Sequence, residues 1–289
     1  MPRCRLSQRA TLMLMSDEGQ GPPLLARKHG IEPFRVVVVH GGPGAAGEMG
    51  PVAQRLGRSR GVLEPMQSAT TVYGQVDELR LTLESLCVPP VVLIGHSWGA
   101  WLVCFVAAKY PALVRKMILI GAPAFDEKYV PLLRENRLQR LAPAARQEFI
   151  ELAELLNRPS DVGEATARLG RLGELASNTD TYDPISLDFD LPAPSIAEKG
   201  GEIYAGVWPE AAAIRRNGEL LPIVSRIECA VVAIHGEYDP TPVDAVAAPL
   251  AATLQDFQIV VLEKCGHDPW RERWAVNEFY DILDGQLIS

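Results

Sequence analysis

The sequence contains no long hydrophobic run and no excess of positive charge. No apolar stretch in its 289 residues approaches the roughly 20 residues that a membrane-spanning helix needs. Lys and Arg number 28 against 36 Asp and Glu, so the formal net charge is −8 and the isoelectric point is about 5.3. This charge argues against general electrostatic binding to nucleic acid or to an anionic membrane. We therefore expect neither as a partner.

Cysteine is scarce and shows no pairing pattern. The chain has five, an odd number, scattered at Cys4, Cys87, Cys104, Cys229 and Cys265. Three of them lie inside apolar stretches, which is typical of reduced thiols and not of a disulfide framework or a metal site. The apolar residues 10–15 near the basic N-terminus are shorter than the hydrophobic region of a signal peptide, and no small-residue cleavage site follows them. These features predict a cytoplasmic protein.

The order of apolar and amphipathic segments predicts the fold class. Short apolar runs rich in β-branched residues alternate with helical patterns, without internal repeats. This alternation predicts an α/β fold, with a mostly parallel central sheet flanked by helices. Strands are predicted at 34–39, 91–94, 116–120, 230–235 and 258–262, with shorter ones at 11–15, 24–26 and 61–64. Helices are predicted at 48–56, 75–86, 101–110 and 271–283.

The character of the sequence changes between residues 123 and 222. This region contains charged helical stretches at 132–141 and 144–156 and a loop-rich segment at 177–194, with no strongly apolar strand. We predict that 123–222 is a helical cap inserted into an α/β core formed by residues 1–122 and 223–289.

One strand and the helix after it enclose the pattern Gly95-His96-Ser97-Trp98-Gly99. A serine on such a strand-to-helix turn is forced into a strained, exposed position, and only small residues two before and two after it let the backbone turn so sharply. The helix dipole favours negative charge that develops beside the hydroxyl. The pattern predicts a nucleophile elbow with Ser97 as the nucleophile.

A serine hydroxyl becomes a good nucleophile when a base takes its proton and an acid orients that base. In a parallel sheet both partners come from loops at the carboxyl ends of strands. His267 lies on the loop after the last predicted strand and is the predicted base. His96 lies inside the turn and points away from the place of a base, while His235 is read as a packed structural histidine.

The predicted acid is Asp239, which lies just past the strand at 230–235. The resulting chain order of Ser, Asp and His is the one expected of α/β-hydrolases. Competing carboxylates are Glu237 earlier in the same turn, Asp244 in the first turn of a helix, and Asp268. The last is adjacent in sequence to the predicted base, which gives a poor geometry.

Two backbone N–H groups are expected to stabilise the oxyanion. One belongs to Trp98, the residue after the nucleophile, and the other to the loop His40-Gly41-Gly42-Pro43-Gly44 that follows the strand at 34–39. Missing side chains let this backbone approach a substrate closely. Gly42 is the preferred donor, with Gly41 as an alternative.

These motifs together resemble the α/β-hydrolase superfamily, and the His-Gly-Gly-Pro-Gly and Gly-His-Ser-Trp-Gly segments resemble its proline iminopeptidase branch. The resemblance covers residues 34–121 and 228–287. It implies removal of an N-terminal proline or a similar residue, without a cofactor or a metal. The implied triad is Ser97, Asp239 and His267.

The substrate is left open by the sequence. Residues 62–72 lack the Asp-Gln-Arg-Gly-x-Gly-x-Ser segment usual in iminopeptidases. Trp208 and Glu210 are candidates for a site that binds a substrate amine, although Trp-Pro-Glu also suits a helix start. We therefore expect a serine hydrolase that acts on a small-molecule ester or amide, with a proline-iminopeptidase-like aminopeptidase as the alternative. A non-catalytic protein that binds a small ligand is the alternative from another class. The expected partner is a small molecule or a short peptide.

Overall fold

The fold is described from a computed structural model, in which residues 11–15, 24–156, 161–187 and 199–288 can be described. Cys4 and part of the predicted loop-rich segment at 177–194 lie outside these residues. No helix among the described residues is long and apolar enough to cross a membrane. Cys87, Cys104, Cys229 and Cys265 are free thiols.

An eight-stranded sheet forms the centre of the molecule, with the order β1-β2-β4-β3-β5-β6-β7-β8. The six strands from β4 to β8 in this order are parallel, and β1 and β2 add an antiparallel edge. This is the mostly parallel sheet that the alternation predicts, in the α/β-hydrolase fold that the motif resemblance implies. The strands are β1 (Thr11–Met15), β2 (Leu24–His29), β3 (Phe34–Val39), β4 (Gly61–Pro65), β5 (Val91–His96), β6 (Val114–Ile120), β7 (Ala230–Gly236) and β8 (Phe257–Leu262).

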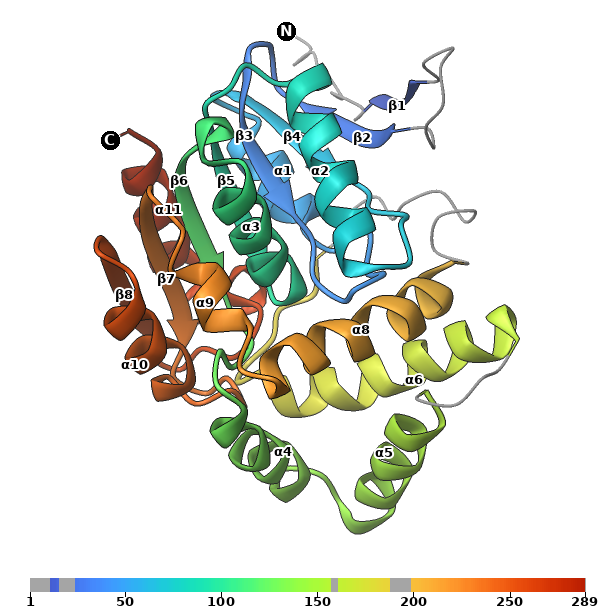
Figure 1. Ribbon diagram of the computed structural model, residues 1–289. Helices are drawn as coiled ribbons and strands as arrows, with labels where there is room; N and C mark the ends of the chain where they lie inside the picture. The colour runs from blue at the N-terminus through green and yellow to red at the C-terminus, as the bar shows by residue number, and fades with distance from the viewer. Residues whose placement is uncertain (1–10, 16–23, 157–160, 188–198, 289) are drawn as a thin grey trace, which may run out of the picture.

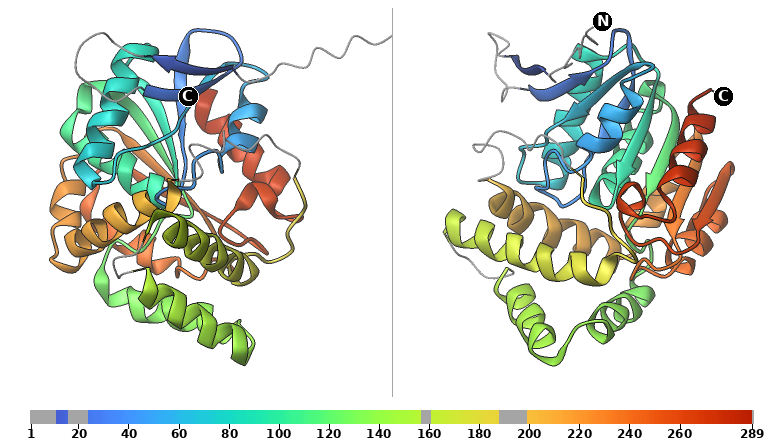
Figure 2. Two further views of the ribbon diagram at one scale, coloured as in Figure 1. Left: turned by 90° about the vertical axis from the view of Figure 1, so that its right-hand side faces the viewer. Right: turned by 180° about the vertical axis from the view of Figure 1, so that it is seen from behind.

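Both faces of the sheet are covered by helices because successive side chains of a strand point to opposite faces. In β3, Val37 and Val39 pack into the hydrophobic cluster on one face, while Val36 and Val38 join the cluster on the other. Figures 1 and 2 show α1 and α11 on the face opposite α2 and α3. These helices are α1 (Gly50–Leu56), α2 (Val72–Leu86), α3 (Trp98–Lys109), α10 (Asp244–Thr253) and α11 (Val276–Ile288), with short 3-10 turns at Pro111–Leu113 and Pro269–Arg271.

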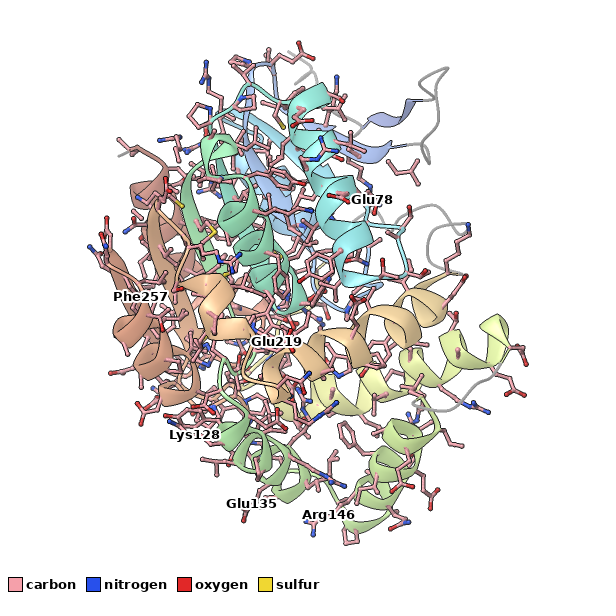
Figure 3. The ribbon with its side chains drawn as sticks, in the orientation of Figure 1. Glu78, Lys128, Glu135, Arg146, Glu219 and Phe257 are labelled. Carbon is pink, nitrogen blue, oxygen red and sulfur yellow. The ribbon has the colours of Figure 1, made fainter. Side chains whose placement is uncertain are left out.

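The described residues between 123 and 222 contain helices and no strand. They lie together beyond the carboxyl ends of β5 and β6 (Figure 1). Buried residues of α8 join the larger core cluster, so the segment is packed onto the sheet layer. Figure 3 shows Glu135 and Arg146 at its outer end, where both side chains are exposed. The helices are Glu127–Tyr129 (a 3-10 turn), α4 (Val130–Gln139), α5 (Pro143–Leu155), α6 (Val162–Asp180), α8 (Gly200–Arg216) and α9 (Leu220–Val224).

The predicted strands are confirmed within a few residues, but the predicted start of the last helix and the predicted start of the loop-rich segment are wrong. The last helix begins at Val276 and not at Arg271, because Pro269–Arg271 forms a 3-10 turn and the Glu272 carboxylate accepts bonds from the Tyr182 and Asp183 amides. The segment predicted to be loop from residue 177 is helical as far as Asp180. Tertiary contacts that bury this end of α6 explain the extension.

Candidate active site

The nucleophile turn joins β5 to α3. Ser97 has φ 50° and ψ −120°, a strained conformation for a residue with a side chain. A Cβ at Gly95 would lie 2.3 Å from the Gly99 carbonyl oxygen, and one at Gly99 would lie 2.5 Å from the Val39 carbonyl oxygen. The two glycines of the motif are therefore required by the close approach of β3, β5 and α3, as the pattern predicts.

The predicted acid and base are in contact. Asp239 follows β7 and His267 follows β8, and His267 Nδ1 lies 2.7 Å from Asp239 Oδ2. The other carboxylate oxygen accepts a hydrogen bond of 2.8 Å from the Thr241 amide. Burial would raise the pKa of Asp239, but the imidazoles of His267 and His235 hold it well below its ordinary value. The carboxylate is thus ionised and can orient the imidazole.

His267 is held by its backbone as well as by its side chain. Its amide donates to the Asp180 carbonyl at the end of α6 at 2.7 Å. Burial lowers the pKa of the imidazole, but the charge and the hydrogen bond of Asp239, together with the charge of Asp268, raise this pKa above its ordinary value. Ser97 and His267 line the same cavity. Among the described hydrogen bonds none joins their side chains, a contact that is often long in sites without substrate.

The competing carboxylates face elsewhere. Glu237 is exposed, and Asp244 begins α10. Asp268 Oδ1 lies 3.3 Å from His96 Nε2. In this arrangement Asp239 is the carboxylate that bonds to the His267 ring.

The predicted oxyanion donors come from the start of α3 and from the glycine loop, which both lie next to Ser97. Trp98 is the first residue of α3, where a backbone N–H has no acceptor within the helix. Gly42 has φ +110° and lines the cavity with Ser97. A Cβ at Gly41 would lie 3.0 Å from the Ser97 Cβ, so this glycine is needed for packing under the nucleophile. The Trp98 indole is buried and donates to Gln75 Oε1 at 2.8 Å.

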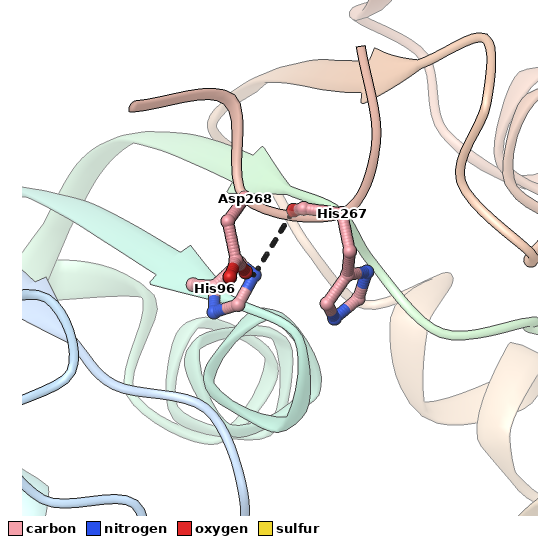
Figure 4. A group of neighbouring side chains, drawn as sticks. All are labelled: His96, His267 and Asp268. Carbon is pink, nitrogen blue, oxygen red and sulfur yellow. Dashed lines mark hydrogen bonds and ion pairs between the residues drawn. The ribbon is translucent and has the colours of Figure 1, made fainter. Parts of the chain in front are cut away.

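Sequence reasoning missed the contacts of His96. Its Nδ1 lies 2.8 Å from Glu48 Oε1, and its Nε2 lies 3.3 Å from Asp268 Oδ1 and 3.2 Å from the His267 carbonyl oxygen. Figure 4 shows His96 beside the loop that carries His267 and Asp268. Burial would lower the pKa of His96, but Glu48 and Asp268 raise it to about 10. No sequence signal marks these partners, which come from distant loops.

A cavity of about 890 Å³ lies above Ser97 and His267. Most of its wall is apolar and comes from α4, α5, α6 and α8. Trp208 is part of this wall, and its ring stacks on Trp101 with centroids 6.0 Å apart. The apolar side chains of the wall include Val130, Leu133, Phe149, Ile150, Leu169 and Leu172.

The other predicted substrate residue lies apart from this cavity. Glu210 Oε2 accepts a hydrogen bond of 2.7 Å from the Val72 amide at the start of α2. Glu210 is not among the residues that line the cavity. The structure thus brings Ser97, His267, Gly42 and Trp208 to one space and places Glu210 as a cap of α2.

The comparisons with known proteins identify the family of this chain. The profile of the alpha/beta hydrolase family matches residues 36–276, most of the chain. The chain therefore belongs to the alpha/beta hydrolase family. Its serine turn and the His267–Asp239 pair lie inside the matched region.

Several solved structures share the fold. VinJ is 18% identical over 96% of this chain and 98% of its own, with a TM-score of 0.68. A carboxylesterase structure from Nitrososphaera gargenis is 21% identical over 96% and 98%, with a TM-score of 0.60. The 2-hydroxy-6-oxo-6-phenylhexa-2,4-dienoate hydrolase of Rhodococcus is 18% identical over 97% and 100%, with a TM-score of 0.60. No curated protein matches the sequence significantly.

Proposed function

We propose that the protein is a serine hydrolase that cleaves a small-molecule ester or amide through an acyl-enzyme on Ser97. The observation that carries this proposal is the strained Ser97 turn, which opens into the same cavity as a histidine bonded to a buried carboxylate. A packed structural histidine does not need this arrangement. A protein that only binds ligand does not need the strained serine, so the binding-protein alternative is disfavoured.

The proposed reaction has two stages. Ser97 Oγ forms a bond to the substrate carbonyl carbon while His267 Nε2 takes the hydroxyl proton. His267 then gives this proton to the departing alcohol or amine, which leaves an acyl-enzyme. In the second stage water gives its proton to His267 and attacks the acyl carbon. The Ser97–acyl bond breaks, the proton returns to Ser97 Oγ, and the carboxylic acid is released.

The backbone supplies the charge stabilisation in both stages. The tetrahedral intermediate carries a negative oxygen, which the N–H groups of Trp98 and Gly42 are proposed to bind. Asp239 holds the His267 ring with Nε2 free and stabilises the imidazolium that forms. No cofactor is part of this proposal.

The cavity favours a neutral, largely apolar substrate over a peptide with a free N-terminal amine. An ammonium group would be bound by a carboxylate without another cationic partner. The acidic groups nearest Ser97 already have partners: Asp180 bonds to Arg137, and both Glu48 and Asp268 pair with His96. Glu154, a fourth acidic residue of the wall, is exposed on α5. An iminopeptidase activity is therefore the second candidate.

The test compares a short-chain nitrophenyl ester with a prolyl anilide that carries a free amine. We expect ester hydrolysis, labelling by a fluorophosphonate, and the loss of both in Ser97→Ala. The folded state of this variant is checked by circular dichroism. Preference for the anilide would move the assignment to the aminopeptidase. Absence of both turnover and labelling in the wild-type protein would contradict the hydrolase.

A further inference from the structure

One buried charged group has no part in the proposed proton transfers. His96 immediately precedes the nucleophile and is 1% exposed. Both of its ring nitrogens face carboxylates, Glu48 at 2.8 Å and Asp268 at 3.3 Å. An imidazole between two carboxylates keeps its second proton, and it is therefore a cation at neutral pH.

The contacts of His96 connect three separate segments of the site. Glu48 belongs to the turn between the glycine loop and α1, and Asp268 follows the proposed base. His96 itself ends β5 and is joined to the strained Ser97 turn. His96 Nε2 also lies 3.2 Å from the His267 carbonyl oxygen. His96 therefore contacts two residues, His267 and Asp268, of the loop after β8, which we call the base loop. The His96 and His267 rings lie 4.7 Å apart between centroids.

The space around His96 is filled. The Trp270 ring packs edge-on against it, with centroids 4.7 Å apart. A Cβ at Gly41 would lie 3.0 Å from both His96 Nδ1 and Glu48 Oε2. The glycine loop therefore packs directly on the His96–Glu48 pair. A shift of this pair would move the backbone of Gly42, the proposed oxyanion donor.

A metal ion is the alternative occupant of this cluster. Ligand atoms of His96, His267 and Asp268 lie within 4.8 Å of one another. A metal, however, needs a ring nitrogen with a free lone pair. Each nitrogen of His96 instead faces a carboxylate oxygen, and two neighbouring negative charges favour the fully protonated ring, which has no free lone pair. The geometry is thus that of an ion network.

We propose that His96 is a positioning residue: a buried cation that joins the glycine loop to the base loop and holds His267 in place beside Ser97. This inference rests on the proposed function, because it assigns a role in the same reaction. His96 does not touch the substrate and transfers no proton.

The cation also acts on the charge of the base. The charged groups that face the two imidazoles are Asp239 after β7, Asp268 after the base and Glu48 before α1. Arg271 lies 3.5 Å from Asp268. The carboxylates Asp239 and Asp268 raise the pKa of His267, while the His96 charge lowers it. Removal of the His96 cation should therefore raise the pKa of His267. Removal of the Asp268 charge should lower it.

The experiment compares His96→Gln with Asp268→Asn. In His96→Gln the carboxylates remain without their cation, so we expect the acid limb of kcat/KM to move to higher pH. We also expect kcat at the new optimum to fall by about 100-fold, the cost of a misplaced catalytic group, with little change in KM. In Asp268→Asn we expect the acid limb to move to lower pH.

A second readout does not depend on turnover. The His267 ring is titrated by NMR in Ser97→Ala, alone and combined with each of the two substitutions. The same opposite shifts are expected there. His29→Gln is the matched control, because His29 is also buried and lies 2.8 Å from Glu64, but at the far edge of the sheet. It should leave the His267 titration unchanged.

Equal or absent shifts in the two variants would overturn the inference, and so would a shift in the His29 control of the same size. Either of these results would leave the hydrolase assignment intact if the fluorophosphonate still labels Ser97 in the wild-type protein. If the wild-type protein neither hydrolyses esters nor is labelled, the proposed function fails, and the NMR titration still decides whether His96 controls the charge of His267.

Discussion

The sheet layer and the helical segment contribute differently to the site. Ser97, Asp239 and the glycine loop are held by backbone contacts of the parallel strands, where an added methyl group would collide with a neighbouring carbonyl. The helical segment instead presents side chains that are partly exposed, held by pairs such as Arg137–Asp180 and Arg215–Glu127. For the proposed hydrolase, this comparison assigns the reacting groups to the sheet layer and most of the substrate-contacting side chains to the helical segment. Substitutions in the two regions should therefore have separable effects.

The largest expected effect is on the rigid side. Asp239→Asn should lower kcat by about 10⁴-fold, as loss of the orienting carboxylate does in other triad enzymes, because the His267 ring loses its fixed tautomer. Pre-steady-state kinetics on a nitrophenyl ester measures it. A variant with normal kcat would show that another carboxylate, such as Asp268, orients the base.

Gly99→Ala tests the packing of the same layer. The added methyl group would lie 2.5 Å from the Val39 carbonyl oxygen and 2.6 Å from the His40 carbonyl oxygen, both of which are backbone atoms. We expect a loss of about 3 kcal/mol in the free energy of unfolding, at the upper end of overpacking effects. Urea denaturation measures it. An unchanged midpoint would mean that the junction of β3 and α3 adapts more easily than its contacts indicate.

Ile150→Trp tests the adaptable side. Ile150 lies on α5 and lines the apolar wall of the cavity. The larger tryptophan side chain should raise KM for esters with long acyl chains by about 10-fold. The KM for acetate esters and the value of kcat should stay nearly unchanged. A chain-length series provides the measurement. An equal effect on short and long esters would indicate that the segment also positions the catalytic groups.

The smallest effect is expected at Gly170, which lies inside α6. A Cβ there would meet no atom within 4 Å, in contrast to Gly99. Gly170→Ala should stabilise the protein by about 0.5–1 kcal/mol, since alanine favours the helix. The melting temperature measures this gain. A loss of stability would contradict the open space beside α6.

The parts of the site that could be predicted from sequence are those set by local patterns. The Ser97 turn is encoded within five residues. Asp239 and His267 each follow an apolar strand, and the carboxyl ends of parallel strands lie at the same edge of the sheet. The His96 network could not be predicted, because Glu48 and Asp268 are brought to it by the fold. The same applies to Glu210, whose bond to the Val72 amide depends on how α8 packs against α2. The polar end of α6 is predicted to be loop, but its polar residues bond to tertiary partners such as Arg137 and Arg140 and remain helical.

The hydrogen bond from the His267 amide to the Asp180 carbonyl has a consequence for engineering. Segments inserted into a hydrolase core are attractive units to exchange when a new substrate range is wanted. In this protein such a graft would carry away the acceptor of the base loop, together with the wall of the cavity. For the proposed hydrolase, a chimera must reproduce a carbonyl at the position of residue 180, so a change of specificity would also require rebuilding the support of His267.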